Sequence, residues 1–464
     1  MVFSSVIFLF FFFPVVLIGY YLLKNITLKN VFLLLASLFF YAWGEGILVL
    51  LVVISAFINY SFGYLVSVSR RKKLFLAIGV ILNLSMLIYY KYFGFIIDNL
   101  DRFKFIHANK VNIALPIGIS FFTFHGLSYL IDIYRGNAKV QKSFFNLLLY
   151  ITFFPQLVAG PIIRYHDVAD QLLKRESTID KTVEGIRRFI IGLAKKILIA
   201  NQLGALADQI LNTDLSLYGY KVAWLGIISY MLQIYYDFSG YSDMAIGMAK
   251  MFGFDFLENF NFPYITRSIR EFWTRWHISL SNWFRDYLYI PLGGSRNGDF
   301  ATYRNLLIVF FCTGLWHGAS WSFIIWGFYH GFFMIIERLF LSKYLDKSRI
   351  LSHLYALPVL IISWVFFRIE DFKQALRFLA KMFNFFPGKE TKLHVMAFMN
   401  TEYWVILIIA ILLCIPWQRI ILIEKQRHRL VMEYVNVAFL LAIFLLSIMS
   451  VVTDTYNPFI YYRF

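Results

Sequence analysis

Two histidines stand in glycine-framed motifs within the most apolar part of the chain. His317 lies in "GLWHGAS" (314–320) and His330 lies in "GFYHG" (327–331). An ionisable side chain at membrane depth is costly, so it usually faces a polar interior and indicates function by default. A histidine there can act as a general base toward a hydroxyl group, because its ordinary pKa lies near neutrality. A structural role is the competing interpretation for each ring.

Packing alone explains the glycines around both rings. Gly314 and Gly318, like Gly327 and Gly331, form a G-x-x-x-G pattern that lets another helix approach closely. On one unbroken helix the two histidines would point about 220° apart, so at most one could serve a given site. A helix break at "GASW" (318–321) would remove that argument. Periodicity therefore does not choose between the two rings.

A third histidine, His277, lies in a stretch that is too polar to span a membrane and unusually aromatic. Residues 270–288 are predicted to form one amphipathic helix, which would lie in the membrane interface or pack across a helix bundle. His277 falls on its apolar side, near Trp273. Its polar face carries Glu271, Arg275, Asn282, Arg285 and Asp286, and the first two of these are spaced for an i,i+4 ion pair.

Other candidate groups carry weaker evidence. Asp237 in "DFSGYSD" (237–243) follows an apolar span, where capping of the next helix is favoured over catalysis or cation binding. The chain has no H-E-x-x-H, Cys-x-x-Cys, P-loop or G-x-S-x-G motif, so metal catalysis and a serine hydrolase are unsupported. A low prior of function is assigned to the histidines in or beside polar loops: His107, His166, His353, His394 and His428.

The elements that must position these residues are membrane helices. Of 464 residues, 60% are hydrophobic and 15% are charged, against about 25% charged in a soluble domain. About ten to twelve apolar segments are expected to cross the bilayer. Basic loops such as "SRRKK" (69–73) predict an N-terminus outside. The net charge of +17 is therefore attributed to topology and contacts with lipid headgroups, and no nucleic-acid partner is expected.

Two further segments depart from simple crossing helices. The prolines and the glycine in "FFPQLVAGPIIRY" (153–165) predict a broken, re-entrant segment, and "FKQALRFLAKMF" (372–383) is predicted to be interfacial. No long repeat or linker interrupts the chain, so a single membrane domain over residues 1–464 is expected.

Long motifs resemble one family. Residues 235–296, from "YYDFSGYSD" to "YIPLGGSR", and the following "GLWHGASWSFIIWGFYHG" closely resemble the membrane-bound O-acyltransferases, in the bacterial branch for alginate and peptidoglycan O-acetylation. The stretches 115–136, 153–165 and "NPFIYYRF" (457–464) are similar to that branch too. The resemblance implies an all-α integral membrane fold. It would be a ring of about 10–12 transmembrane helices around a thinned, funnel-shaped core, with interfacial and re-entrant helices and a catalytic core at about 115–340.

The resemblance also implies roles for individual residues. His317 corresponds to the invariant catalytic histidine of the family, and His277 corresponds to its second signature position. His330 and His125 receive no catalytic role and are expected to serve packing or hydrogen bonding. Residues expected to contact substrate are Trp316, Trp276, Asn282, Arg285 and Asp286.

The implied reaction needs no metal and no permanently bound cofactor. Acetyl-CoA would act as the acyl donor from the cytoplasmic side of a bacterial inner membrane, with His317 as the base. An extracytoplasmic partner of the SGNH hydrolase type would complete transfer to a polysaccharide such as alginate or peptidoglycan. The alternatives are D-alanyl transfer to teichoic acids, as in a related branch, and a non-catalytic transporter or scaffold. The lack of an internal repeat weighs against a transporter.

Overall fold

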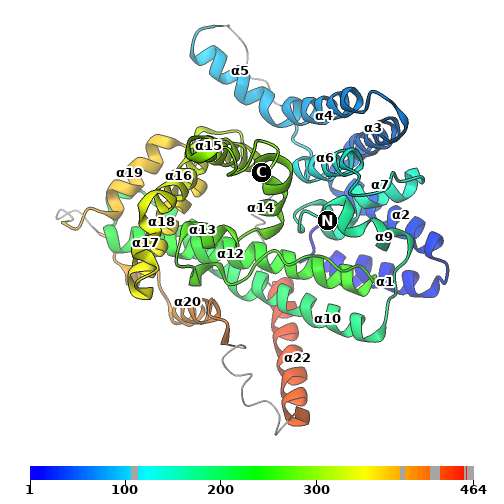
Figure 1. Ribbon diagram of the computed structural model, residues 1–464. Coiled ribbons are helices and arrows are strands. Elements are labelled where there is room, and N and C mark those ends of the chain that lie inside the picture. The colour runs from blue at the N-terminus through cyan, green and yellow to red at the C-terminus, as the bar shows by residue number, and fades with distance from the viewer. Residues whose placement is uncertain (106–112, 387–391, 418–428, 454–455, 457–464) are drawn as a thin grey trace. The chain divides into compact units, whose positions relative to one another are not determined.

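The chain is helical throughout the part that the structure describes. The computed structural model describes residues 1–105, 113–386, 392–417, 429–453 and 456 (Figure 1), and these residues contain no β-strand. They fall into two compact units. Unit 1 comprises Met1–Phe189 and Ser242–Glu258, and unit 2 comprises Ile190–Tyr241 and Asn259–Ile460.

Several helices are long and apolar enough to cross a bilayer. Among the described residues six segments meet that standard: Ile26–Val68, Lys72–Arg102, Ile179–Leu211, Trp321–Leu345, Arg349–Arg368 and Glu433–Thr453. Two shorter apolar helices, Phe8–Leu22 and Thr401–Leu413, accompany them. These segments confirm an all-α integral membrane protein. The count of ten to twelve crossings and the outside position of the N-terminus stay predictions.

Unit 1 is held together by polar and glycine contacts between apolar helices. Its helices are α1 Phe13–Leu22, α2 Ile26–Glu45, α3 Val49–Val68, α4 Lys72–Leu87, α5 Phe93–Arg102, α6 Ile119–Arg135, α7 Phe144–Thr152, α8 Phe154–Leu157 and α9 Tyr165–Leu173. Buried Asn59 on α3 and Asn83 on α4 exchange two amide hydrogen bonds of 3.0 Å. Such side-chain bonds join helices in lipid, where hydrophobic burial gives little drive for association.

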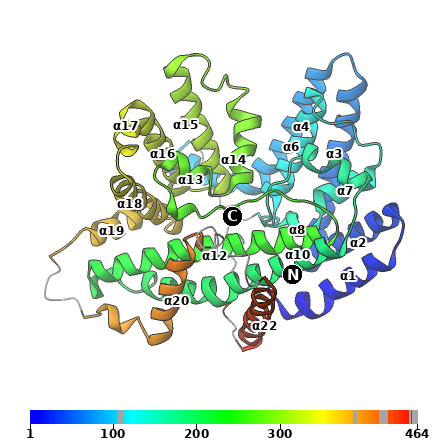
Figure 2. The same cartoon turned by 60° about the horizontal axis from the view of Figure 1, so that its bottom comes forward.

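Two long helices, α10 (Ile179–Ala194) and α12 (Tyr220–Met251), contribute to both units. They run side by side in Figures 1 and 2. Glycines permit the approach: a Cβ on Gly185 would lie 2.5 Å from the Gly247 carbonyl oxygen, and one on Gly240 would lie 2.7 Å from that of Gly192. Only glycine fits such backbone contacts.

Asp237 lies inside α12, so the prediction that it caps a new helix is wrong. The helix continues without interruption from Tyr220 to Met251, because the small residues of "DFSGYSD" let α10 approach closely enough to support it. The Asp237 carboxylate instead forms an ion pair with the Lys196 ammonium. The polar region therefore begins after Met251 rather than at residue 237.

Unit 2 contains the helices that follow in sequence. They are α11 Asn201–Leu211, α13 Ile269–Trp273, α14 Ile278–Phe284, α15 Gly298–His317, α16 Trp321–Ile336, α17 Ser342–Leu345, α18 Arg349–Arg368, α19 Phe372–Met382, α20 Thr401–Leu413 and α22 Arg429–Thr453. Helix α19 covers nearly all of the segment 372–383 and buries Ala375, Phe378 and Met382. Its interfacial position stays a prediction.

Helices α15 and α16 form a tight hairpin (Figure 2). Gly327 of α16 lies against the Phe310 carbonyl oxygen and Gly314 of α15, and Gly314 lies against the Phe323 carbonyl oxygen. The glycine-framed motifs thus pack the two helices against each other, which confirms the close approach predicted from the G-x-x-x-G pattern.

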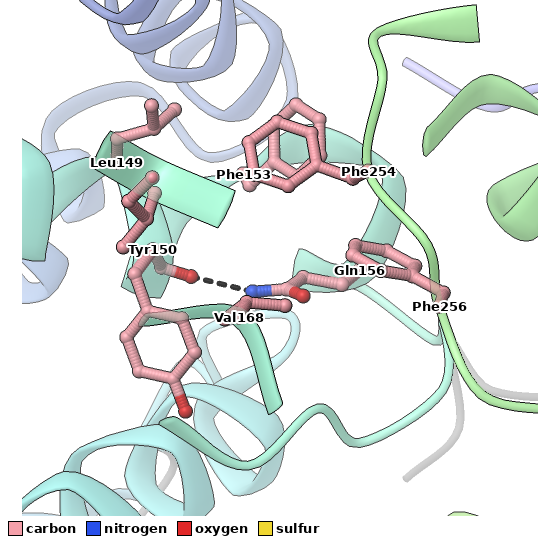
Figure 3. Close-up of a pocket in the computed structure, with 8 residues that line it drawn as sticks. Leu149, Tyr150, Phe153, Gln156, Val168, Phe254 and Phe256 are labelled. Atoms are coloured by element: carbon pink, nitrogen blue, oxygen red, sulfur yellow. Dashed lines mark hydrogen bonds between the residues drawn. The ribbon is translucent and has the colours of Figure 1, made fainter. Parts of the chain in front are cut away.

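The segment 153–165 is broken, as its prolines predict. After the four-residue helix α8, the backbone from Val158 to Arg164 has no regular structure, although residues 153–163 are all buried. Figure 3 shows Gln156 donating its amide to the Tyr150 carbonyl beside a small cavity, with Phe153, Phe254 and Phe256 around it. Whether the segment re-enters the membrane stays a prediction.

Candidate active site

A helix break brings His317 and His330 into one cluster. His317 ends α15, Gly318 is extended (φ −172°), and Ser320 caps the start of α16. Because α16 runs antiparallel to α15, both imidazoles contact the indole of Trp326 edge-to-face. The ring centroids lie 5.0 Å away for His317 and 4.9 Å away for His330. The separation of about 220° on one helix therefore does not apply here.

His277 does not lie on a continuous helix, so the single helix predicted over 270–288 is wrong. Helix α13 ends at Trp273, and His277 has left-handed backbone angles (φ 44°, ψ 53°) just before α14 begins. A non-glycine residue in this region is strained and needs support from its surroundings. Asn259 supplies that support, because its backbone carbonyl accepts from Ile278 N at 3.0 Å.

Asn259 also fixes the protonation pattern of the His277 ring. Its side-chain oxygen accepts from Ser279 N at 3.2 Å, which identifies that atom as oxygen. The His277 Nδ1 lies 3.1 Å from the same oxygen and must therefore carry a proton. Burial lowers the pKa of His277. The neutral ring thus presents Nε2 as an acceptor, and Nε2 has no hydrogen-bond partner among the described residues.

Trp316 joins the two signature histidines. Its ring centroid lies 5.7 Å from that of His277 and 4.9 Å from that of His317. Phe238 of α12 covers His277 at 4.6 Å, and Phe367 of α18 contacts His317 at 5.0 Å. All five side chains are buried. The structure therefore brings His277, Trp316 and His317 together in a dry aromatic setting inside unit 2.

The remaining predicted site residues lie in different surroundings. Trp276 packs on Phe260, Phe272 and Trp364, with centroids 5.0, 5.5 and 4.9 Å away. Asn282 is half-buried on α14.

The charged residues of the predicted polar face pair with one another. The predicted pair of Arg275 and Glu271 is confirmed at 2.8 Å. Arg285 is largely exposed and pairs with its neighbour Asp286 at 2.8 Å. Substrate contact by Trp276, Asn282, Arg285 or Asp286 stays a prediction.

Other histidines are held by local contacts. His125 lies on α6 in unit 1 with its ring 5.4 Å from that of Tyr150, and His353 faces the Thr266 carbonyl at 3.1 Å. His166 lies on α9 and pairs with buried Asp132 at 2.8 Å, so its surroundings are more specific than a polar loop. His107 and His428 lie outside the described residues. Within the described ranges no three His, Cys, Asp or Glu side chains gather as a metal-binding group.

Asn259 is the main site residue that the sequence analysis missed. It lies 18 positions before His277 in an irregular segment, where no helical or strand period links the two residues. Trp326 was missed for a different reason. Its role as a shared contact of His317 and His330 depends on the break at Gly318.

The family model for the membrane-bound O-acyltransferases matches residues 135–369, a range that contains both signature histidines. The chain therefore belongs to the membrane-bound O-acyltransferase family, and it is a multi-pass membrane O-acyltransferase.

Individual relatives have related names. The chain is 44% identical over 394 residues to the probable alginate O-acetylase AlgI of Azotobacter vinelandii, covering 83% of this chain and 78% of the relative. It is 36% identical over 420 residues to the peptidoglycan O-acetyltransferase of Helicobacter pylori, covering 82% and 80%. It is 31% identical over 253 residues to the teichoic acid D-alanyltransferase of Bacillus subtilis, covering 50% of this chain and 62% of the relative.

Proposed function

We propose that this enzyme transfers acetyl groups from acetyl-CoA for the O-acetylation of an extracytoplasmic polysaccharide such as alginate or peptidoglycan. Relatives named for these two reactions match over most of both chains. The match to the D-alanyltransferase covers half of this chain, which favours acetyl over D-alanyl transfer. A non-catalytic transporter or scaffold does not fit a chain of this enzyme family.

One observation carries the choice of catalytic residues. His317 and His277 contact the same indole, that of Trp316, within a fully buried cluster. A buried imidazole suits proton abstraction from a hydroxyl, which is the step that acyl transfer to oxygen requires.

The proposed chemistry has one proton transfer and one acyl transfer. A nitrogen of His317 accepts the proton of the acceptor hydroxyl while the hydroxyl oxygen attacks the thioester carbonyl carbon. A tetrahedral intermediate forms, the carbon–sulfur bond breaks, and the CoA sulfur leaves and takes up the proton from His317. His277 presents its Nε2 lone pair and orients a donor group of a substrate. Trp316 holds the two rings at their spacing.

The donor is proposed to enter from the cytoplasm and the enzyme to lie in the bacterial inner membrane. The immediate acceptor is proposed to be a hydroxyl of an extracytoplasmic SGNH-type partner, which passes the acetyl group to the glycan. A membrane-embedded base suits this arrangement because the two substrates come from opposite sides.

The test replaces His317 with Ala and measures acetyl-CoA turnover and polysaccharide acetylation at matched membrane abundance. A general base contributes roughly 10²–10⁴-fold, so a loss of at least about 100-fold is expected. His277→Ala is expected to impair transfer as well. His394→Ala, at an exposed position on the same unit, is the matched control. Unchanged acetylation by the His317 variant would overturn the assignment.

A further inference from the structure

Two buried polar atoms in the aromatic cluster around His317 have no hydrogen-bond partner among the described residues: Trp326 Nε1 and His330 Nε2. Both side chains are fully buried. Buried polar groups are nearly always paired, so each exception needs an explanation such as catalysis or a missing ligand. Their rings are in contact, with centroids 4.9 Å apart, and Trp326 also contacts His317.

The free nitrogen of His330 is a donor. Trp273 Nε1 donates to His330 Nδ1 at 3.3 Å, and an indole nitrogen can only donate. His330 Nδ1 is therefore an unprotonated acceptor, and the neutral ring carries its hydrogen on Nε2. His277 and His330 are thus fixed in opposite tautomers. His277 presents an acceptor at Nε2, while His330 presents an N–H at the same position.

Packing accounts for the faces of the His330 ring but not for this donor. Phe272 and Phe310 lie nearly parallel to the imidazole, at interplanar angles of 14° and 16°. A phenylalanine at position 330 would satisfy those two neighbours and would bury no polar nitrogen. The Trp273–His330 hydrogen bond instead holds the ring in the one tautomer that leaves a donor available.

We propose that Trp326 and His330 form a donor pair for the carbonyl oxygen of the transferred acyl group. This inference rests on the proposed function. When the acceptor oxygen attacks the carbonyl carbon, the π electrons of the C=O bond move onto the carbonyl oxygen, which becomes negatively charged in the tetrahedral intermediate. The two N–H groups stabilise this charge beside His317 and release it when the carbon–sulfur bond breaks. Fixed donors aimed at developing charge are an effective catalytic device in a dry site.

The test uses aromatic replacements that preserve packing. The double variant Trp273→Phe/His330→Phe removes the donor from His330 and also removes the indole donor that would otherwise lose its acceptor. Trp326→Phe removes the second donor. Each variant is measured for acetyl-CoA turnover, KM and thermal unfolding in detergent. We expect kcat to fall by about 100-fold or more with little change in KM or melting temperature.

A conservative variant separates donation from shape. His330→Gln offers an amide N–H and is expected to retain more activity than His330→Leu, which has no donor. A double phenylalanine variant with normal kcat would overturn the donor pair. If that variant does not fold, equal activity of His330→Gln and His330→Leu, together with normal kcat in Trp326→Phe, would overturn it.

One assay distinguishes failure of the donor pair from failure of the proposed function. The His317→Ala variant is measured in the same assay. Loss of activity in His317→Ala with full activity in the double phenylalanine variant would reject the donor pair alone. Full activity in His317→Ala would reject the general-base proposal. Nitrogen-15 NMR of histidine-labelled protein gives an independent readout, and protonation of His330 at Nδ1 rather than Nε2 would contradict the inference.

Discussion

Lys196 Nζ and Asp237 Oδ1 lie 2.6 Å apart, and both side chains are 2% exposed. Lys196 belongs to the π-helical turn Lys195–Ala200 that follows α10, and Asp237 lies inside α12. Asp237 directly precedes Phe238, whose ring covers His277. The ion pair therefore sets the register of α12 where that helix meets the site.

Removing one partner of this pair is expected to destabilise the protein strongly. Asp237→Leu leaves the Lys196 ammonium buried without its carboxylate, at a cost of about 3–5 kcal/mol. The double variant Lys196→Met/Asp237→Leu is expected to recover most of that loss, because neither charge is then buried alone. Thermal unfolding in detergent measures both. A double variant that is no more stable than the single variant would show that the pair does not act as a unit.

Asn259 is expected to act on activity through His277. Asn259→Ala removes the oxygen that holds Nδ1–H, so the ring is free to rotate or change tautomer. Acetyl-CoA turnover is expected to fall roughly 10- to 100-fold, the scale of a small misplacement in a catalytic site. Asn259→Asp keeps an acceptor oxygen and is expected to retain more activity.

A control at Ser279 separates ring orientation from loop stability. Ser279 Oγ donates to the same Asn259 oxygen at 2.8 Å, and Ser279→Ala deletes that bond without touching the His277 ring. Equal losses of turnover in Asn259→Ala and Ser279→Ala would argue that Asn259 only supports the loop.

The hairpin of α15 and α16 is expected to be intolerant of a methyl group at Gly327. A Cβ there would collide with the Phe310 carbonyl, whereas a Cβ at Gly331 would lie 3.3 Å from the Phe310 Cβ. Gly327→Ala is expected to destabilise the protein by about 1–3 kcal/mol or more, because backbone cannot move aside as a side chain can. Gly331→Ala is the matched control and should cost less. Similar melting temperatures for the two variants would contradict this account of the hairpin.

The sequence predicts the membrane helices well because their chemistry is local. Apolar length marks the spans, the prolines mark the break in 153–165, and glycine spacing marks the close approach of α15 and α16. Each of these features depends on residues that are near one another in the chain.

The sequence predicts the site less well because its geometry depends on tertiary contacts. The amphipathic period over 270–288 suits one helix, yet bonds from distant Asn259 turn the chain at His277. Aspartate is a residue type favoured at helix N-caps. Asp237 nevertheless lies inside α12, where α10 packs closely, and it forms an ion pair with Lys196. In both cases a contact between distant segments overrides the local preference.

His166 is expected to make stability depend on pH. Its ring on α9 pairs with buried Asp132 of α6, and the other nearby charged groups are Asp167 of α9 and Arg164, which caps the start of that helix. The hydrogen bond to Asp132 raises the pKa of His166 above its ordinary value of 6.5. The folded state therefore binds the proton more tightly than the unfolded state. The resulting stabilisation is fully present below pH 6.5 and is lost as pH rises through the higher folded value.

The corresponding measurement is the melting temperature in detergent between about pH 5.5 and 9, compared with His166→Gln. The difference between wild type and variant should shrink as pH rises, and Asp132→Asn should abolish it because the charged partner is gone. His394→Gln, at an exposed histidine, should leave the wild-type profile unchanged. A difference that stays constant or grows with pH would show that the His166–Asp132 contact does not favour the protonated ring.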